Sequence, residues 1–143
     1  MKSGFEYLEH TSDVLVRAFA ETINEAFEQA GKALIGVLVQ NPRDVSPSLK
    51  KEFVVSGDTL EELLYRYLEE LIYLFDTERL LFSRFNTEVR SLPPRYECRV
   101  TVFGEKLDTL KHRPGIEVKA VTYHMMNVVQ LKTKSEVTFL LDI

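Results

Sequence analysis

A strongly amphipathic stretch between residues 60 and 75 constrains the fold of this 143-residue chain more than any other feature. Its apolar residues recur at intervals of three and four, which lays one apolar stripe along a helix. They are Leu60, Leu63, Leu64, Tyr67, Leu68, Leu71, Ile72 and Phe75. Asp58, followed three residues later by Glu61, has the spacing of a helix start signal. The opposite face is acidic, and we interpret it either as a solvated face or as a docking surface for a basic partner.

A second helix is predicted to begin at Thr22, which forms a capping-box pattern with Glu25. The apolar residues between Ile23 and Leu38 follow the same helical period, and the Asn41-Pro42 pair stops the helix because proline removes an amide donor. Alternation and turn signals predict strands in the remaining segments. The expected strands cover residues 14–20, 51–56, 80–89, 96–104, 116–132 (one long strand or a bent pair) and 137–143.

These elements predict an α+β fold in the order β-α-β-α-β-β-β-β, with the two helices packed on one face of a mixed sheet in a two-layer arrangement. The length is that of one domain, so we expect a single domain over residues 1–143. A content of 45% hydrophobic and 28% charged residues is typical of a globular protein.

Composition also excludes several classes of function. The net charge of −4 lacks the basic footprint that tight RNA or DNA binding requires. No apolar run is long enough to span a membrane and no signal peptide is evident, so we expect a cytoplasmic protein. The single cysteine, Cys98, is expected to be a core or half-buried residue, and it forms no zinc-site spacing with the three histidines. Nucleophile and phosphate-loop motifs are absent from the sequence.

Carboxylates near the two ends of the chain are the candidate site. Asp13 closes a polar pentad before the strand at residues 14–20, and Asp142-Ile143 closes the last strand. If these ends meet, Asp13, Asp142 and a terminal oxygen of Ile143 offer the oxygen ligands that calcium or magnesium prefers over zinc. The alternative is that Asp13 caps a turn and Asp142 is solvated.

Three further residues are candidates for a role towards a partner. Lys119 lies in a strand-like segment rich in polar side chains, and it is otherwise a surface lysine. His124 ends the same segment and His10 lies in the pentad. For both histidines, a hydrogen-bonded structural role is the alternative to a metal ligand.

Four segments resemble the archease family in the same order and over essentially the whole length. The segments are EYLEHTSDV, LEELLYRYLEELIYLFDTERLLF, GEKLD followed by IEVKAVTYH, and a terminal LDI. The resemblance implies a two-layer α+β fold and a non-enzymatic cofactor of an RtcB-type RNA ligase, which seals RNA in tRNA splicing. Family members promote guanylylation of the ligase by GTP and its multiple turnover.

Carried onto matching positions, the resemblance implies metal binding by Asp13, Asp142 and a backbone oxygen of Ile143, and a role for Lys119 in activating the partner. We expect calcium, with magnesium or manganese as alternatives. Two other functions compete with this one. A metal-dependent hydrolase would use Asp13, Asp142, Lys119 and His124 around an activated water, and a general chaperone would need a large exposed apolar patch.

Overall fold

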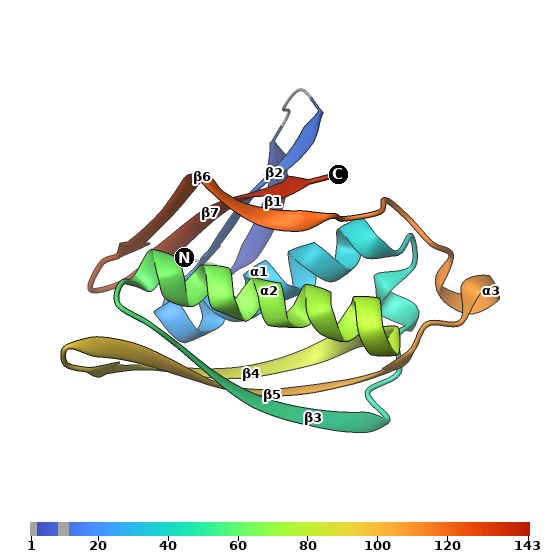
Figure 1. The fold of residues 1–143 in the computed structure, drawn as a ribbon, viewed down its shortest axis with the longest axis horizontal. Helices are drawn as coiled ribbons and strands as arrows, with labels where there is room; N and C mark the ends of the chain where they lie inside the picture. Colours follow the sequence, from blue (N-terminus) through green and yellow to red (C-terminus); the bar gives the residue numbers. More distant parts are fainter. Residues whose placement is uncertain (1–2, 9–11) are drawn as a thin grey trace.

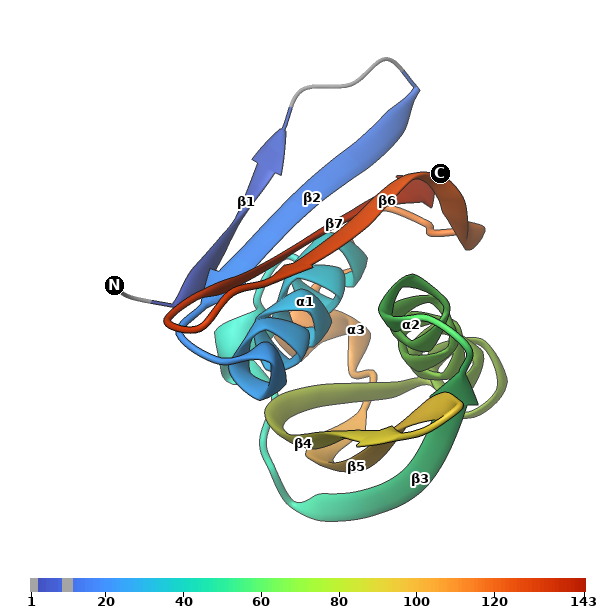
Figure 2. The same ribbon diagram turned by 90° about the vertical axis from the view of Figure 1, so that its left-hand side faces the viewer.

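The computed structural model, which describes residues 3–8 and 12–143, places two long helices between two sheets (Figures 1 and 2). The first sheet has the strand order β1-β2-β7-β6, formed by Gly4–Leu8, Asp13–Ala20, Ser135–Asp142 and Ala120–Gln130. The second has the order β3-β5-β4, formed by Leu49–Gly57, Arg95–Lys106 and Leu80–Leu92. Each pair of neighbouring strands in these sheets is antiparallel.

Both long helices contact both sheets. Helix α1, Ile23–Leu38, packs on β2 of the first sheet and on β4 of the second. Helix α2, Leu60–Glu78, packs on β6 and β3 in the same way. Figure 2 shows the resulting three layers, in which the helices separate the sheets. Two short helical turns complete the fold, the 3-10 turn η1 (Pro42–Asp44) and α3 (Thr109–His112).

The α+β class and the predicted alternation of long helices with strands are confirmed, but the single mixed sheet covered on one face is wrong. The physical reason lies in α1, which buries Gly31, Ala33 and Ile35 in addition to its predicted stripe. A helix that is apolar on more than one side needs a packing layer on each side. The strand β1 was also not predicted, and the long strand expected from residue 116 begins at Ala120.

The caps of the two helices show how local chemistry sets their starts. The Thr22 hydroxyl accepts the Glu25 amide at 3.2 Å, which confirms the predicted cap of α1. Helix α2 is capped by Thr59 rather than Asp58, because the Thr59 hydroxyl accepts the Glu62 amide at 3.0 Å. The Glu62 carboxylate accepts the amide of Asp58 at 2.6 Å, so the capping pair lies one residue later than predicted.

Side chains of the helices also bond to the outer strands. In α1, Glu28 accepts the Thr87 amide of β4 at 3.0 Å and the Asn24 side chain accepts the Val89 amide at 2.7 Å. In α2, Glu61 accepts the Val128 amide of β6 at 3.0 Å. Amides at sheet edges are thereby satisfied by the layer between the sheets.

Two expectations about individual segments can be compared with this fold. Cys98 lies in the core with no exposed surface, as predicted, and its burial raises the pKa of the thiol to about 12. Within the part of the chain that the structure describes, no helix combines the length and apolar character needed to cross a bilayer.

Candidate functional site

The two segments that carry the candidate carboxylates are neighbouring strands. In the antiparallel pair β2–β7, Asp13 lies directly opposite Asp142. Val14 and Leu141, the next pair, pack towards the core, so the alternating direction of strand side chains turns both aspartates to the outer face. Side chains directly opposite on one face have Cβ atoms about 4.5–5.5 Å apart. We call Asp13, Asp142 and the adjacent Ile143 the acidic tip.

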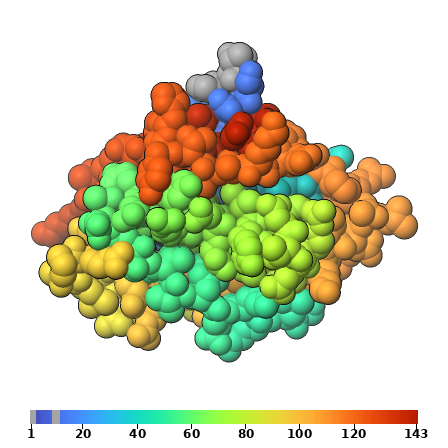
Figure 3. Space-filling view, viewed as in Figure 1, coloured from blue at the N-terminus to red at the C-terminus, as the bar shows by residue number. Residues whose placement is uncertain are grey.

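Lys119 adjoins the acidic tip through its backbone. Its amide donates to the Asp142 carbonyl at 2.8 Å, and the following residue, Ala120, pairs with Asp142 in the β6–β7 ladder. The Lys119 side chain is exposed. The fold therefore gathers Asp13, Asp142, Ile143 and Lys119 from the start of β2, the end of β7 and the start of β6. Figure 3 shows the dark red carboxyl end of the chain between the blue segment and the orange segment.

The two candidate histidines are placed differently. His10 lies outside the described residues. His124 lies in an irregular part of β6, where the register with β7 shifts between Thr122 and Asn127. Its amide donates to the Thr122 hydroxyl at 2.8 Å and its side chain is exposed. No hydrogen bond or ion pair between described residues joins the His124 ring to Asp142.

The ligand atoms that the acidic tip offers are of the chemical type that a hard cation prefers. Carboxylate and carbonyl oxygens are the ligands of calcium, magnesium and manganese. Among residues 3–8 and 12–143, however, no three side chains of His, Cys, Asp or Glu converge as a metal site. Two aspartates and a main-chain oxygen would thus need further oxygens, from water or from a partner, to complete six or more ligands.

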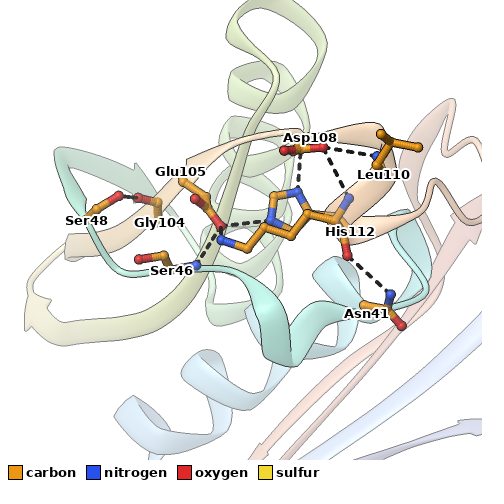
Figure 4. Close-up of polar contacts among 9 residues, drawn as sticks. Asn41, Ser46, Ser48, Gly104, Glu105, Asp108, Leu110 and His112 are labelled. Carbon is orange, nitrogen blue, oxygen red and sulfur yellow. Dashed lines mark hydrogen bonds and ion pairs between the residues drawn. The ribbon is translucent and has the colours of Figure 1, made fainter.

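A second polar centre lies near the end of β5 and was not predicted (Figure 4). The ring of His112 has no exposed surface, and its Nε2 lies 2.8 Å from Oε2 of Glu105. The Asp108 amide donates to Nδ1 at 2.9 Å. Because Nδ1 accepts a hydrogen bond, the proton resides on Nε2 and is donated to the carboxylate, so both ring nitrogens are satisfied in the neutral imidazole.

Glu105 accepts three hydrogen bonds at the same oxygen. Lys111 Nζ lies 2.7 Å from Oε2, and the Ser46 amide donates to it at 2.8 Å, in addition to His112. These bonds, with Lys111 contributing most, lower the pKa of the Glu105 carboxyl to about 2. We call Glu105, Lys111, His112, Ser46 and Asp108 the Glu105 cluster.

The Glu105 cluster is connected to the acidic tip by backbone hydrogen bonds along the end of α1. The amides of Asn41 and Gln40 donate to the carbonyls of His112 and Arg113 at 2.9 and 2.7 Å. The amides of Gly115 and Ile116 donate back to carbonyls of the last turn of α1 at 2.8 and 2.9 Å. This segment then continues to Lys119, so its path towards the tip is fixed on α1.

A hollow of about 600 Å³ lies beside the acidic tip, between the β1–β2 hairpin and the end of α1. Tyr7, Val37 and Ile116 are among its mostly apolar lining residues, and Asp13 stands at its margin. The Tyr7 hydroxyl donates to the Ala33 carbonyl at 2.8 Å, which ties the hairpin to the helix. Gly36 leaves room for this contact, because a Cβ there would lie 2.5 Å from the Tyr7 hydroxyl and would displace it.

These features define a small α+β domain with two helices between antiparallel sheets and a carboxylate tip formed by both ends of the chain. The same architecture occurs in the solution structure of protein 1598 of Methanobacterium thermoautotrophicum, with a TM-score of 0.85, 29% identity and coverage of 98% of this chain and 99% of that one. A crystal structure described as an archease and possible chaperone, from Thermotoga maritima, shares the fold at a TM-score of 0.59 and 16% identity, over 96% of each chain.

Sequence comparison assigns the family. Residues 5–143 match the Archease protein family (MTH1598/TM1083). The chain is 42% identical to Protein archease of Pyrococcus furiosus over 127 residues, or 89% of each protein. It is 37% identical to Protein archease of Sulfurisphaera tokodaii over 139 residues, which cover 97% of this chain and 98% of that relative. The chain belongs to the archease family, as its four sequence segments predicted.

Proposed function

We propose that this chain is a non-catalytic protein cofactor of an RtcB-type RNA ligase, which promotes guanylylation of the ligase by GTP and its multiple turnover in tRNA splicing. Membership of the archease family supports the proposal. The observation that carries it is the pairing of Asp13 with Asp142, since the two aspartates named from opposite ends of the sequence are directly opposite residues of neighbouring strands. The protein would act in the cytoplasm.

A divalent cation would be held at the acidic tip by Asp13, Asp142 and a backbone oxygen of Ile143. Two carboxylates directly opposite each other repel, and a bound cation removes that repulsion. Calcium is the favoured ion because its coordination is the most tolerant of irregular oxygen sets, with magnesium or manganese as alternatives. When bound, the ion would present a positive charge and exchangeable ligand positions to a partner.

The partner we propose is the ligase protein and not its RNA. The chain has a formal net charge of −4, so it gains little from phosphate neutralisation. The outward direction of Asp13 and Asp142 also opposes an approaching phosphate backbone. Lys119, next to the tip, and the candidates His10 and His124 are the nearby residues that could contact the ligase.

The test is multiple-turnover RNA ligation by an RtcB-type ligase with GTP and a divalent metal. The intact chain should raise turnover, whereas Asp13→Ala and Asp142→Ala should not. Asp44→Ala is the matched control because Asp44 is an exposed aspartate in η1, outside the tip. Full activation by folded Asp142→Ala protein would contradict the role of the tip.

The same preparation distinguishes the competing functions. If a competent ligase does not respond to the intact chain, the purified protein should be assayed alone for metal-dependent hydrolysis. Suppression of aggregation of unrelated proteins would instead support a chaperone, with the apolar hollow beside Tyr7 and Ile116 as the first surface to change.

A further inference from the structure

A smaller hollow of about 210 Å³ lies on the seam between α2 and the start of β6. Its walls are two tyrosines, Tyr65 and Tyr73, and two carboxylates, Glu69 and Asp76. Lys119 lines it as well, and buried Ile72 adds an apolar surface. We call this hollow the tyrosine–carboxylate pocket.

The size of this pocket indicates what it can hold. Sites for small-molecule ligands usually measure about 300–1,000 Å³. A hollow of about 210 Å³ is smaller than that range and suits a single long side chain inserted from a partner. Tyrosine is among the residues most enriched where one protein anchors a side chain of another.

One aromatic wall of the pocket, Tyr73, is exposed, and the other, Tyr65, is half-buried and held in place. The Tyr73 side chain is 57% exposed. The Tyr65 ring stacks on Tyr123 of β6 with centroids 4.2 Å apart and planes 11° apart, so its orientation is set by a neighbouring element. A rigid aromatic surface at the rim of a pocket loses little conformational entropy when a partner covers it.

The charged side chains around the pocket indicate which kind of side chain could bind in it. Glu69 pairs with Arg66 at 3.3 Å across an exposed contact, a kind of pair that contributes little. Asp76 takes part in no ion pair between described residues. The Arg66 guanidinium also lies over the Tyr65 ring, 5.6 Å from its centroid, so Arg66 offsets Glu69. Asp76 is then the carboxylate that remains for a partner, because the ammonium of Lys119 can move into solvent on its flexible stem. A cationic side chain is complementary to this pocket.

We propose that the tyrosine–carboxylate pocket receives an arginine side chain of the partner protein. That this partner is the ligase rests on the proposed function. Arginine fits better than lysine because its planar guanidinium can stack on a tyrosine ring, here that of the exposed Tyr73, and can bond a carboxylate such as that of Asp76 through two N–H groups. The backbone bond from Lys119 to Asp142 joins the pocket to the acidic tip. A docked arginine therefore fixes where the tip lies on the partner.

The test measures the dissociation constant of the complex with the ligase for the intact chain and single variants. Tyr73→Ala and Asp76→Asn should each weaken binding about tenfold or more. Both positions are exposed, so the variants should remain folded, which circular dichroism checks. Tyr73→Phe keeps the ring and should bind within about twofold of the intact chain.

Two controls separate this inference from the proposed function. Glu70→Gln removes one carboxylate of the same helix outside the pocket and should leave binding unchanged. Asp142→Ala should bind but fail to activate. If the intact chain binds and activates the ligase while Tyr73→Ala and Asp76→Asn bind equally well, the pocket has no such role and the proposed function stands. If the intact chain does not bind the ligase, both proposals are wrong.

Discussion

The acidic tip and the Glu105 cluster both place a carboxylate near the end of a strand, but they surround it with opposite kinds of neighbour. Glu105 receives three donors at one oxygen, from Lys111, His112 and the Ser46 amide. Asp142 is paired in the strand register with another acidic residue, Asp13. The comparison teaches that hydrogen-bond donors supplied by the fold stabilise the charge of Glu105, whereas the paired aspartates are where we propose that a cation from outside would add stability.

The largest expected effect is on stability, at His112. Replacing His112 by alanine leaves a cavity and removes the partners of both the Asp108 amide and Glu105, so it should lower the free energy of unfolding by about 2–4 kcal/mol. Urea denaturation measures the change. His124→Ala is the matched control, since His124 is exposed and its loss should cost less than about 0.5 kcal/mol. Equal effects of the two would contradict the structural role of His112.

The next effect concerns the charge of Glu105. Glu105→Gln should cost about 1.5–3 kcal/mol at pH 7, because it weakens charge-assisted hydrogen bonds. The folded pKa of about 2 lies below the ordinary value of 4.5, so the stabilisation is present above pH 4.5 and is lost as the pH falls towards 2. Stability measured from pH 7 to pH 2 should therefore fall less steeply in Glu105→Gln than in the intact chain. The exposed Glu52→Gln is the control, and an unchanged slope in Glu105→Gln would count against the prediction.

At the acidic tip the same kind of substitution should act in the opposite direction. In the presence of a chelator, Asp142→Asn should raise the free energy of unfolding by about 0.2–1 kcal/mol, because it removes a like-charge pair across β2 and β7. Adding calcium should raise the melting temperature of the intact chain and leave that of Asp142→Asn unchanged.

Glu136→Gln, on the same strand, is the control for the direction of this change in the free energy of unfolding. Glu136 pairs with Arg17 at 2.8 Å, so its neutralisation should slightly destabilise the protein. Destabilisation by Asp142→Asn in the chelator would show that the tip is balanced within the fold, which would remove the contrast with Glu105.

The smallest effect is expected at Lys111. Its ammonium lies 2.7 Å from Glu105, but its side chain is 41% exposed, so Lys111→Ala should cost less than about 1 kcal/mol. Thermal denaturation at low and high salt measures it, and the difference should shrink as salt increases. A loss as large as that of His112→Ala would mean that the ammonium, and not the buried ring, holds Glu105.

The sequence predicted those parts of the fold that depend on near neighbours. The stripe of α2 and the Thr22 cap of α1 are patterns within a few residues, and both are confirmed. The pairing of β2 with β7 joins opposite ends of the chain, and nothing local reveals it. The second sheet was missed for a related reason, because the extra buried residues of α1, such as Ala33 and Ile35, are individually ordinary in any helix.

The candidate site shows the same division. Asp13, Asp142 and Lys119 were named from sequence, and the strand register supplied their proximity. The Glu105 cluster was not identified as a site. Glu105 and Asp108 lie in the GEKLD segment, but the resemblance gave neither a role, and the bond from the Ser46 amide crosses between distant segments. No pattern in the sequence predicted that the His112 ring would be buried.

The bonds from the helices to the outer strands have a consequence for how copies of this chain can associate. Strand β4 has amides bonded to Asn24 and Glu28, and β6 has one bonded to Glu61. Between described residues, the edge strands β1 and β3 have no amide bonded to a helix side chain, so they are the more open edges of the two sheets. A sheet that grows by strand addition needs an accepting edge on both sides. If two copies joined along β1, or along β3, the outer edge of the joined sheet would be β6 or β4 in each copy. Because amides of these strands are bonded to helix side chains, the continuous sheet would stop growing at two copies.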